Sequence, residues 1–188
     1  SLVLGNKKTS KLPNALLKHL LGGRIFVKDN AQKTKNSTFY SWSINMCKEE
    51  IKHIHRYKGL IGIILDKGRH CGKATQKKIN AIRNPIKKKE AFIQLILDTI
   101  FFYVESIGEK SAWDILTLGT DFDGVITHFD CYENMSKMPV LKEDLNLYLN
   151  VHKYRKELWF DLSPEEILDK IFRLNAMNFL TKNFKDTL

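Results

Sequence analysis

Two apolar runs of strand length, separated by a long helical segment, place the tightest limit on the fold of this chain. The run "LIGIIL" (Leu60–Leu65) is continuously apolar, which is typical of a parallel strand covered on both faces. A second short strand, "DILTL" (Asp114–Leu118), follows a helical segment over Lys87–Ile107 that Gly108 ends. Strands that alternate with helices indicate β/α units around a parallel sheet. The sequence therefore predicts an α/β fold.

The rest of the chain continues this alternation of strands, helices and polar loops. Ser163 and Glu166 form the two ends of a capping box around Pro164, which predicts a helix that begins there. The other predicted helices are Leu12–Leu21, Met46–Tyr57, Pro139–Asn150 and Ala176–Phe184, the further strand is Arg24–Val27, and the polar loops are Asp29–Ser43, Asp66–Pro85 and residues 119–138.

Two aspartates, Asp121 and Asp123, stand directly after the second strand in "LTLGTDFDGV". A carboxylate buried there without a partner would cost free energy, and a metal ion, a substrate amine or backbone N–H donors would each offset that cost. In parallel β/α folds, chemistry takes place beyond the C-terminal ends of the strands. The pair is therefore a candidate catalytic site, with turn capping as the alternative for each residue.

A formal charge of +10 raises the question of an anionic partner. Nine basic residues and no acidic one lie between Lys67 and Lys89, as a surface that tracks phosphates would require. The excess of Lys over Arg and the lack of interleaved aromatic residues argue against base recognition. We therefore expect a solvated helix start and loop here, and nucleic-acid binding is kept only as an alternative.

Length, composition and cysteine usage predict one globular domain in a reducing compartment. With 188 residues, 43% of them hydrophobic, the chain can bury one sizeable core. No apolar stretch reaches the ~20 residues of a membrane span, and the N-terminal residues lack the order of a signal peptide. Cys47, Cys71 and Cys131 are odd in number and widely spaced, so we expect free thiols and a cytoplasmic location.

Three stretches resemble a known family when they are taken in order: "DILTLGTDFDGV", "YENMSKMPVLKEDL" and "LSPEEILDKIFRLNAMNFL". They are similar to the C-terminal part of the membrane (renal) dipeptidase family, which are zinc peptidases of the amidohydrolase superfamily. "INMCKEEIKHIHRYKGLIGIIL" looks like the helix and strand that precede this part, so the resemblance covers roughly residues 45–184. It implies that residues 1–188 form a single domain, the C-terminal portion of a dipeptidase-like β/α barrel.

The resemblance also implies a mechanism, which is hydrolysis of a small peptide or amide substrate at a two-zinc site. Asp121 matches the aspartate on the family's last barrel strand, which would accept a proton from the attacking water and pass it to the leaving amine. Asp123 would chiefly shape the loop through hydrogen bonds to backbone N–H groups, and contact with substrate is its second candidate role.

The chain departs from this family in its metal ligands and in its length. The family's His-x-Asp pair on the first strand is absent, and so is any convincing bridging Glu, so the metal ligands are unknown. A closed TIM-type barrel needs about 250 residues, and this length predicts a partial one with parallel strands and C-terminal helices. We expect either a portion of a longer protein or a degenerate relative. Exposed sheet edges would then pair with another segment or with a second copy of the chain.

Five further side chains merit consideration as site residues. Arg69 is a candidate clamp for a substrate carboxylate, and His128 is a candidate substrate contact from the loop after the aspartates. His53 and His55 lie on a predicted helix, about 200° apart, and share no face. His70 follows a strand end, which is a permissible ligand position, but no third partner has suitable spacing.

The leading hypothesis is a metal-dependent dipeptidase-like hydrolase that uses metal-activated water, with zinc as the cofactor by resemblance. One alternative is a non-catalytic barrel relative with a binding or assembly role. The other is a basic nucleic-acid-binding protein, for which binding that weakens with salt would be the signature.

Overall fold

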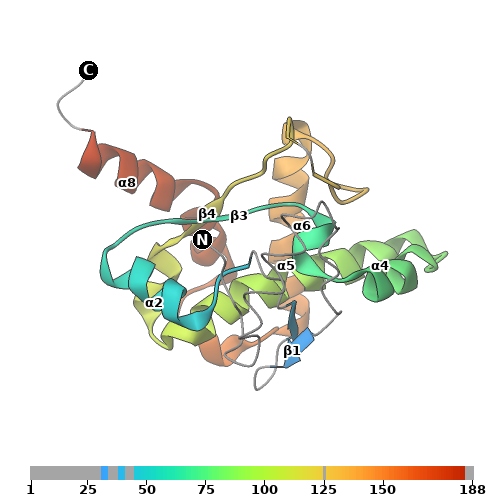
Figure 1. The fold of residues 1–188 in the computed structure, drawn as a ribbon, viewed down its shortest axis with the longest axis horizontal. Coiled ribbons are helices and arrows are strands. Elements are labelled where there is room, and N and C mark those ends of the chain that lie inside the picture. The colour runs from blue at the N-terminus through green and yellow to red at the C-terminus, as the bar shows by residue number, and fades with distance from the viewer. Residues whose placement is uncertain (1–30, 34–37, 41–44, 125, 185–188) are drawn as a thin grey trace, which may run out of the picture.

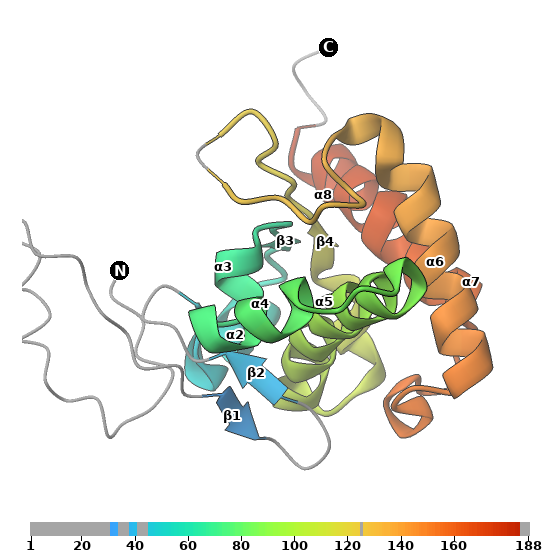
Figure 2. The same cartoon turned by 90° about the vertical axis from the view of Figure 1, so that its right-hand side faces the viewer.

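The computed structural model describes residues 31–33, 38–40, 45–124 and 126–184 of the chain. In this part, helices pack against one face of a two-stranded parallel sheet, and a two-stranded antiparallel ribbon lies at the edge of the helical layer (Figures 1 and 2). The predicted helix Leu12–Leu21 and the predicted strand Arg24–Val27 lie outside the described residues.

Four short strands and seven helices, taken in chain order, form the regular structure of the described residues. The strands are β1 (Ala31–Lys33), β2 (Thr38–Tyr40), β3 (Ile61–Ile63) and β4 (Leu116–Leu118). The helices are α2 (Lys48–Arg56), α3 (Lys67–His70), α4 (Lys73–Asn80), α5 (Pro85–Ile107), α6 (Met138–His152), α7 (Pro164–Asp169) and α8 (Asn175–Asn183). Shorter helical turns are η2 (Lys110–Asp114), η3 (Met135–Lys137), η4 (Lys156–Leu158) and the π-helical η5 (Lys170–Leu174). Helices α2, α6 and α8 confirm the predicted helices Met46–Tyr57, Pro139–Asn150 and Ala176–Phe184.

Helix α5 lies under the parallel sheet, and the sequence sets both of its ends. Asn84 caps its start by accepting hydrogen bonds from the N–H groups of Ile86 and Lys87, at 3.0 and 3.1 Å. Gly108 ends it in the left-handed region, with a φ of 81° that glycine adopts without strain. The predicted helix is confirmed, with its start two residues earlier than expected.

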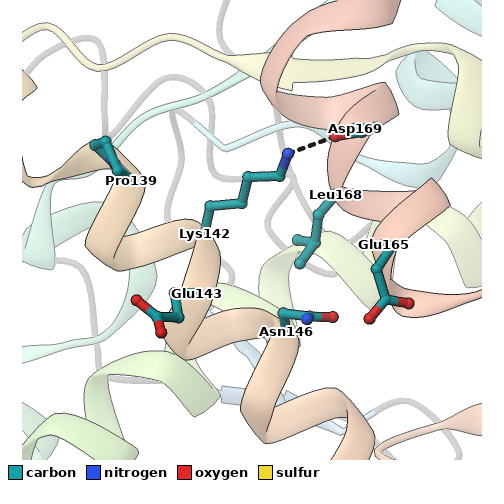
Figure 3. A pocket seen from close by; sticks show the side chains of 7 residues that line it. All are labelled: Pro139, Lys142, Glu143, Asn146, Glu165, Leu168 and Asp169. Carbon is teal, nitrogen blue, oxygen red and sulfur yellow. Dashed lines mark hydrogen bonds and ion pairs between the residues drawn. The ribbon is translucent and has the colours of Figure 1, made fainter.

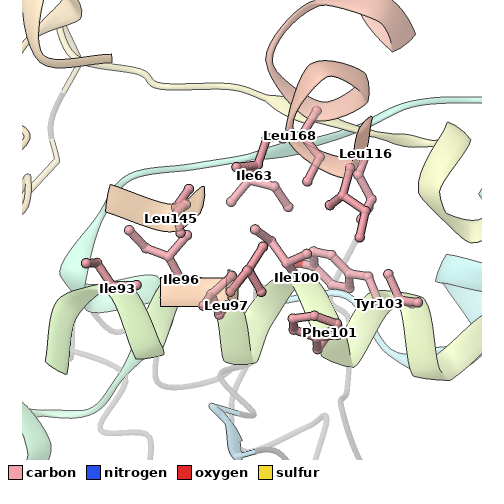
Figure 4. Close-up of a cluster of buried hydrophobic side chains, with 14 of the residues drawn as sticks. Ile63, Ile93, Ile96, Leu97, Ile100, Phe101, Tyr103, Leu116, Leu145 and Leu168 are labelled. Atoms are coloured by element: carbon pink, nitrogen blue, oxygen red, sulfur yellow. The ribbon is translucent and has the colours of Figure 1, made fainter. Parts of the chain in front are cut away.

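Strands β3 and β4 run parallel and are joined through α3, α4 and α5, so the predicted β/α unit is present. Their register pairs Ile61 with Leu116 and Ile63 with Leu118. Figure 4 shows Ile63 and Leu116 packed over α5, beside Leu168 of α7. Burial of these apolar side chains against one long helix is what holds the sheet in place.

The opposite face of this sheet is open, which corrects the prediction of a strand covered on both faces. Gly62 is exposed, although its neighbours Ile61 and Ile63 are buried. The apolar run misled the prediction because its outward position is a glycine, which has no side chain to bury. The described residues show the α/β class and one parallel strand pair, and a closed barrel is not among them.

Two segments predicted as polar loops contain regular structure. Within Asp29–Ser43, β1 and β2 pair antiparallel, with Gln32 opposite Phe39. Within Asp66–Pro85, the short helices α3 and α4 form, and Ile79 of α4 is buried against the core. The many lysines of the second segment concealed its helices, because each helix buries very few apolar side chains.

Side-chain hydrogen bonds fix the start of α7 and fasten α8 to the sheet. Ser163 and Glu166 form the predicted capping box of α7: the Ser163 N–H donates to Glu166 Oε2 at 2.7 Å, and the Glu166 N–H donates to Ser163 Oγ at 3.2 Å. Asn175, the first residue of α8, is buried and donates from Nδ2 to the carbonyl oxygens of Trp113 and Leu116, both at 2.7 Å.

Across the described residues, no helix is both long and apolar enough to cross a bilayer.

Candidate functional site

The C-terminal ends of β3 and β4 meet at one edge of the sheet, because the two strands are parallel. Figure 2 shows β3 and β4 side by side. Asp66 follows β3, Asp121 and Asp123 follow β4, and His128 lies further along the loop that continues beyond β4. We call these four residues the strand-end site. Asp66 is half-buried, and the other three are exposed.

Asp66 holds the loop that follows β4. Its Oδ1 accepts hydrogen bonds from the N–H groups of Gly68 at 3.0 Å and Thr127 at 3.2 Å. The Lys67 N–H donates to the Thr127 carbonyl at 2.8 Å, and an antiparallel bridge pairs Asp66 with His128. The Asp66 carboxylate therefore caps α3 and fixes the returning loop at the end of β3.

Asp121 lies where the sequence predicts it, just beyond the C-terminal end of β4. Its φ of 54° is left-handed, which Asp tolerates, and the Gly124 N–H donates to its carbonyl at 3.0 Å to close a turn. A Cβ at Gly124 would stand 2.3 Å from Asp121 Oδ1, so a larger residue there would displace the Asp121 side chain. No described residue forms a hydrogen bond or an ion pair with the Asp121 carboxylate, which is exposed and open to a ligand.

Asp123 and His128 lie on the same loop as Asp121. Asp123 is exposed within the turn, and its predicted hydrogen bonds to the loop backbone are not found among the described residues. The His128 ring is exposed while its backbone pairs with Asp66, and its neighbour Phe129 is fully buried. The loop thus presents His128 outward from an anchored backbone.

Arg69 is held against the body of the protein at the end of β3. Its Nε lies 3.8 Å from Asp66 Oδ2, and its backbone carbonyl accepts a hydrogen bond from Asn45 Nδ2 at 2.8 Å. Because Arg69 already contacts Asp66, a substrate carboxylate at Arg69 would compete with Asp66 for the guanidinium group. The Arg69 charge also acts to lower the pKa of the nearby Tyr103 hydroxyl, which burial raises to about 12.

A buried lysine and an aspartate fasten the loop to the core. The Lys67 ammonium group forms an ion pair with Asp130, and Lys88 of α5 lies 2.9 Å from the second Asp130 oxygen. These two cations hold the pKa of Asp130 below its ordinary value. Both also lie over the Phe92 ring, at 5.4 and 5.9 Å from its centroid, and Phe129 packs against the same ring.

His70 is a core residue and not an accessible ligand. Its Nε2 lies 2.7 Å from the Ile64 carbonyl oxygen, and its Nδ1 lies 2.8 Å from the Thr99 hydroxyl oxygen. Burial lowers the pKa of this imidazole, and its ring packs against Phe129. Both ring nitrogens are engaged, so neither is free to bind a metal ion.

His53 and His55 lie on α2, as predicted, and share no site. His55 Nε2 is 2.8 Å from Ser111 Oγ, whereas the His53 ring packs on Tyr57. Within residues 45–124 and 126–184, no group of three His, Cys, Asp or Glu side chains is placed to hold a metal ion. This part of the chain does not fit the zinc centre that the resemblance implies, and we assign no metal ligand to it.

A separate groove of about 440 Å³ opens between α6 and α7 (Figure 3). Lys142 of α6 forms an ion pair with Asp169 of α7, and this contact holds the pKa of Asp169 below its ordinary value. Glu143 and Glu165 add two further carboxylates to its walls. None of the predicted site residues lines this groove, so it is distinct from the strand-end site.

Comparisons of the chain with protein-family models, with curated proteins and with solved structures gave no match. Any assignment of function therefore depends on the geometry of the residues themselves.

Sequence reasoning missed the parts played by Asp66, Lys67 and Asp130. A signal for Asp66 was present, since an aspartate between a strand and a short helix is a typical N-cap. No local signal marks the pairing of Lys67 with Asp130, because 63 positions separate them in the sequence.

Proposed function

We propose that this chain forms the C-terminal part of a dipeptidase-like hydrolase of the β/α-barrel type, with Asp121 as its general acid–base. The observation that carries the proposal is the position of Asp121, an exposed carboxylate just beyond a parallel strand of a β/α unit. Barrel enzymes place their catalytic groups at this end of their strands. The resemblance of the "GTDFDG" motif supports the same assignment.

In the proposed reaction, Asp121 takes a proton from the attacking water and returns it to the leaving amine. Arg69 binds the carboxylate end of a small peptide, in exchange for its contact with Asp66. Gly62 and Gly119 carry no side chains, and both are exposed on the open face of the sheet. This absence of side chains next to the strand ends leaves room for a substrate.

Zinc, which the resemblance implies, would activate the attacking water when bound. The described residues hold no group of three side chains that could bind it. The proposal requires its metal ligands to come from outside these residues.

Hydrolysis of a dipeptide panel by the 188-residue chain in zinc-containing buffer tests the proposal. Asp121→Asn and Asp123→Asn form a matched pair, because both remove an exposed carboxylate from one turn. We expect Asp121→Asn to lower kcat/KM by roughly 10²-fold or more, which is typical for the loss of an acid–base group. Asp123→Asn is expected to cost far less. Full activity in Asp121→Asn would contradict the proposal, as would a zinc-loaded chain that cleaves no dipeptide.

A non-catalytic binding or assembly role is the second candidate, and the lack of a three-ligand group in the described residues favours it. Among the described residues, β3 and β4 pair only with each other, so the outer edge of each strand is open to pairing with another strand. Metal analysis separates the candidates. About two zinc ions per chain, together with hydrolysis, support the enzyme. A folded chain that binds no zinc and cleaves no dipeptide supports the second candidate.

A further inference from the structure

The segment that contains α4 and the start of α5 carries a positive charge that the proposed hydrolase does not use. The chain has nine basic and no acidic residues from Lys67 to Lys89, and ten basic and seventeen acidic residues from Glu90 to Leu188. Residues 1–66 carry twelve basic and four acidic residues, so the positive excess lies in the N-terminal half of the chain. Within that half, Lys67–Lys89 is a segment whose basic residues have no acidic residue among them.

Ion pairs neutralise four of these nine cations, and the other five lie on α4 and around the start of α5. Four of the nine cations contact a carboxylate: Lys67 and Lys88 contact Asp130, Lys89 contacts Asp144, and Arg69 contacts Asp66. The other five are exposed and form no ion pair with a described residue; they are Lys73, Lys77, Lys78, Arg83 and Lys87, which we call the α4–α5 patch.

The α4–α5 patch projects from the molecule, and one large exposed apolar side chain lies beside it. Figure 1 shows α4 at the right-hand end of the long axis, far from α8. Ile79 of α4 points inward and is 6% exposed, which leaves Lys77 and Lys78 on the outer side. Ile86, in the first turn of α5 beside Lys87, is 65% exposed.

We propose that the α4–α5 patch docks on the surface of an anionic lipid bilayer. Clustered lysines are attracted to acidic head groups, and an apolar side chain among them is stabilised by entering the interfacial region. Bound to RNA or DNA, Ile86 would remain in water, and the segment offers no aromatic side chain for base stacking. The exposed Ile86 therefore favours a bilayer over a nucleic acid.

Co-sedimentation of the 188-residue chain with vesicles tests this docking. We expect binding to phosphatidylcholine vesicles that contain about one third phosphatidylserine, and none to pure phosphatidylcholine. Lys77→Ala/Lys78→Ala should weaken partition roughly twenty-fold, and Ile86→Ser several-fold. The matched control is Lys48→Ala/Lys52→Ala, which removes two exposed charges from α2 and should change partition by less than about two-fold. All altered side chains are exposed, and circular dichroism verifies that each variant is folded.

Three outcomes would overturn the proposal. The first is no binding to the anionic vesicles at low salt. The second is an equal loss in both double variants, which would make net charge, and not the patch, the cause of binding. The third is partition unaffected by Ile86→Ser, together with tight RNA binding that Lys77→Ala/Lys78→Ala abolishes, which would assign the patch to nucleic acid.

Discussion

Gly62 of β3 and Gly119, directly after β4, touch through their backbones across the parallel strand pair. A Cβ on Gly119 would stand 3.2 Å from the Cα of Gly62, and a Cβ on Gly62 would stand 3.3 Å from the Cα of Gly119. Neither backbone can rotate away as a flexible side chain would, so this close approach favours glycine at both positions. Asp121 follows two residues later, and the contact thus sets the point from which its backbone leaves the sheet.

Gly119→Ala should destabilise the protein by about 1–3 kcal/mol, because the added methyl group forces the two strands apart. Urea unfolding measures this loss. Gly68→Ala is the matched control, since a Cβ there would meet Asp66 at an ordinary 3.5 Å. If both variants unfold at the same urea concentration, the two strands have room for a methyl group. The close backbone contact would then not explain the glycine at this position.

Asp130→Asn should destabilise the protein by about 1–2 kcal/mol, because it leaves the buried Lys67 ammonium group without its counter-charge. The expected loss is moderate because Asp130 is 49% exposed and water screens the pair. Limited proteolysis should also cut the loop after β4 more quickly. Asp169→Asn, which breaks the more exposed pair with Lys142, serves as the control and should cost no more than about 0.5 kcal/mol. Equal losses in the two variants would argue against a special role for Asp130.

His70 should make the free energy of unfolding fall as the pH drops below about 6.5. Burial lowers its pKa in the folded protein, so the unfolded chain binds a proton more readily, and acid favours unfolding. The stability that neutral His70 provides is therefore complete above its ordinary pKa and is lost below it. Urea unfolding between pH 5 and 8 measures the slope, which one proton limits to about 1.4 kcal/mol per pH unit. His70→Gln should flatten the curve, and identical slopes for the two proteins would refute the assignment.

Asn175→Ala should cost about 2–4 kcal/mol, because it leaves the buried carbonyl groups of Trp113 and Leu116 without their donor. Thermal or urea unfolding gives the value. Asn178→Ala, at an exposed position of the same helix, should stay within about 0.5 kcal/mol of the unaltered chain. A small effect of Asn175→Ala would mean that water replaces the lost amide.

The sequence predicts elements well where the signal is local. Gly108 ends α5 and Ser163 begins α7 as expected, because each capping signal lies within four residues of the helix end that it fixes. The hairpin of β1 and β2 was missed, since its segment is polar and lacks a strong strand pattern. The helices α3 and α4 were missed for the same reason, and they bury few apolar side chains.

The candidate site shows the same division between local and distant signals. The position of Asp121 after β4 follows from the motif and the strand together, and the structure places it there. The ion pair of Asp130 with Lys67 depends on how distant segments pack, which no periodicity reports, whereas Arg69 contacts Asp66 only three positions away. Pairing between residues 63 positions apart becomes visible only when the chain is folded.

The long helical crossover between β3 and β4 has a kinetic consequence. The two strands are separated by roughly fifty residues, so their pairing closes a large loop and carries a corresponding entropic cost. The backbone hydrogen bonds of α5 lie within its own turns, so they can begin to form before that closure. Asp66 and Asp121 therefore reach the same edge of the sheet only when β3 and β4 pair, and these two strands are the elements of the β/α unit that lie furthest apart in the sequence. A change that slows strand pairing would also delay formation of the strand-end site.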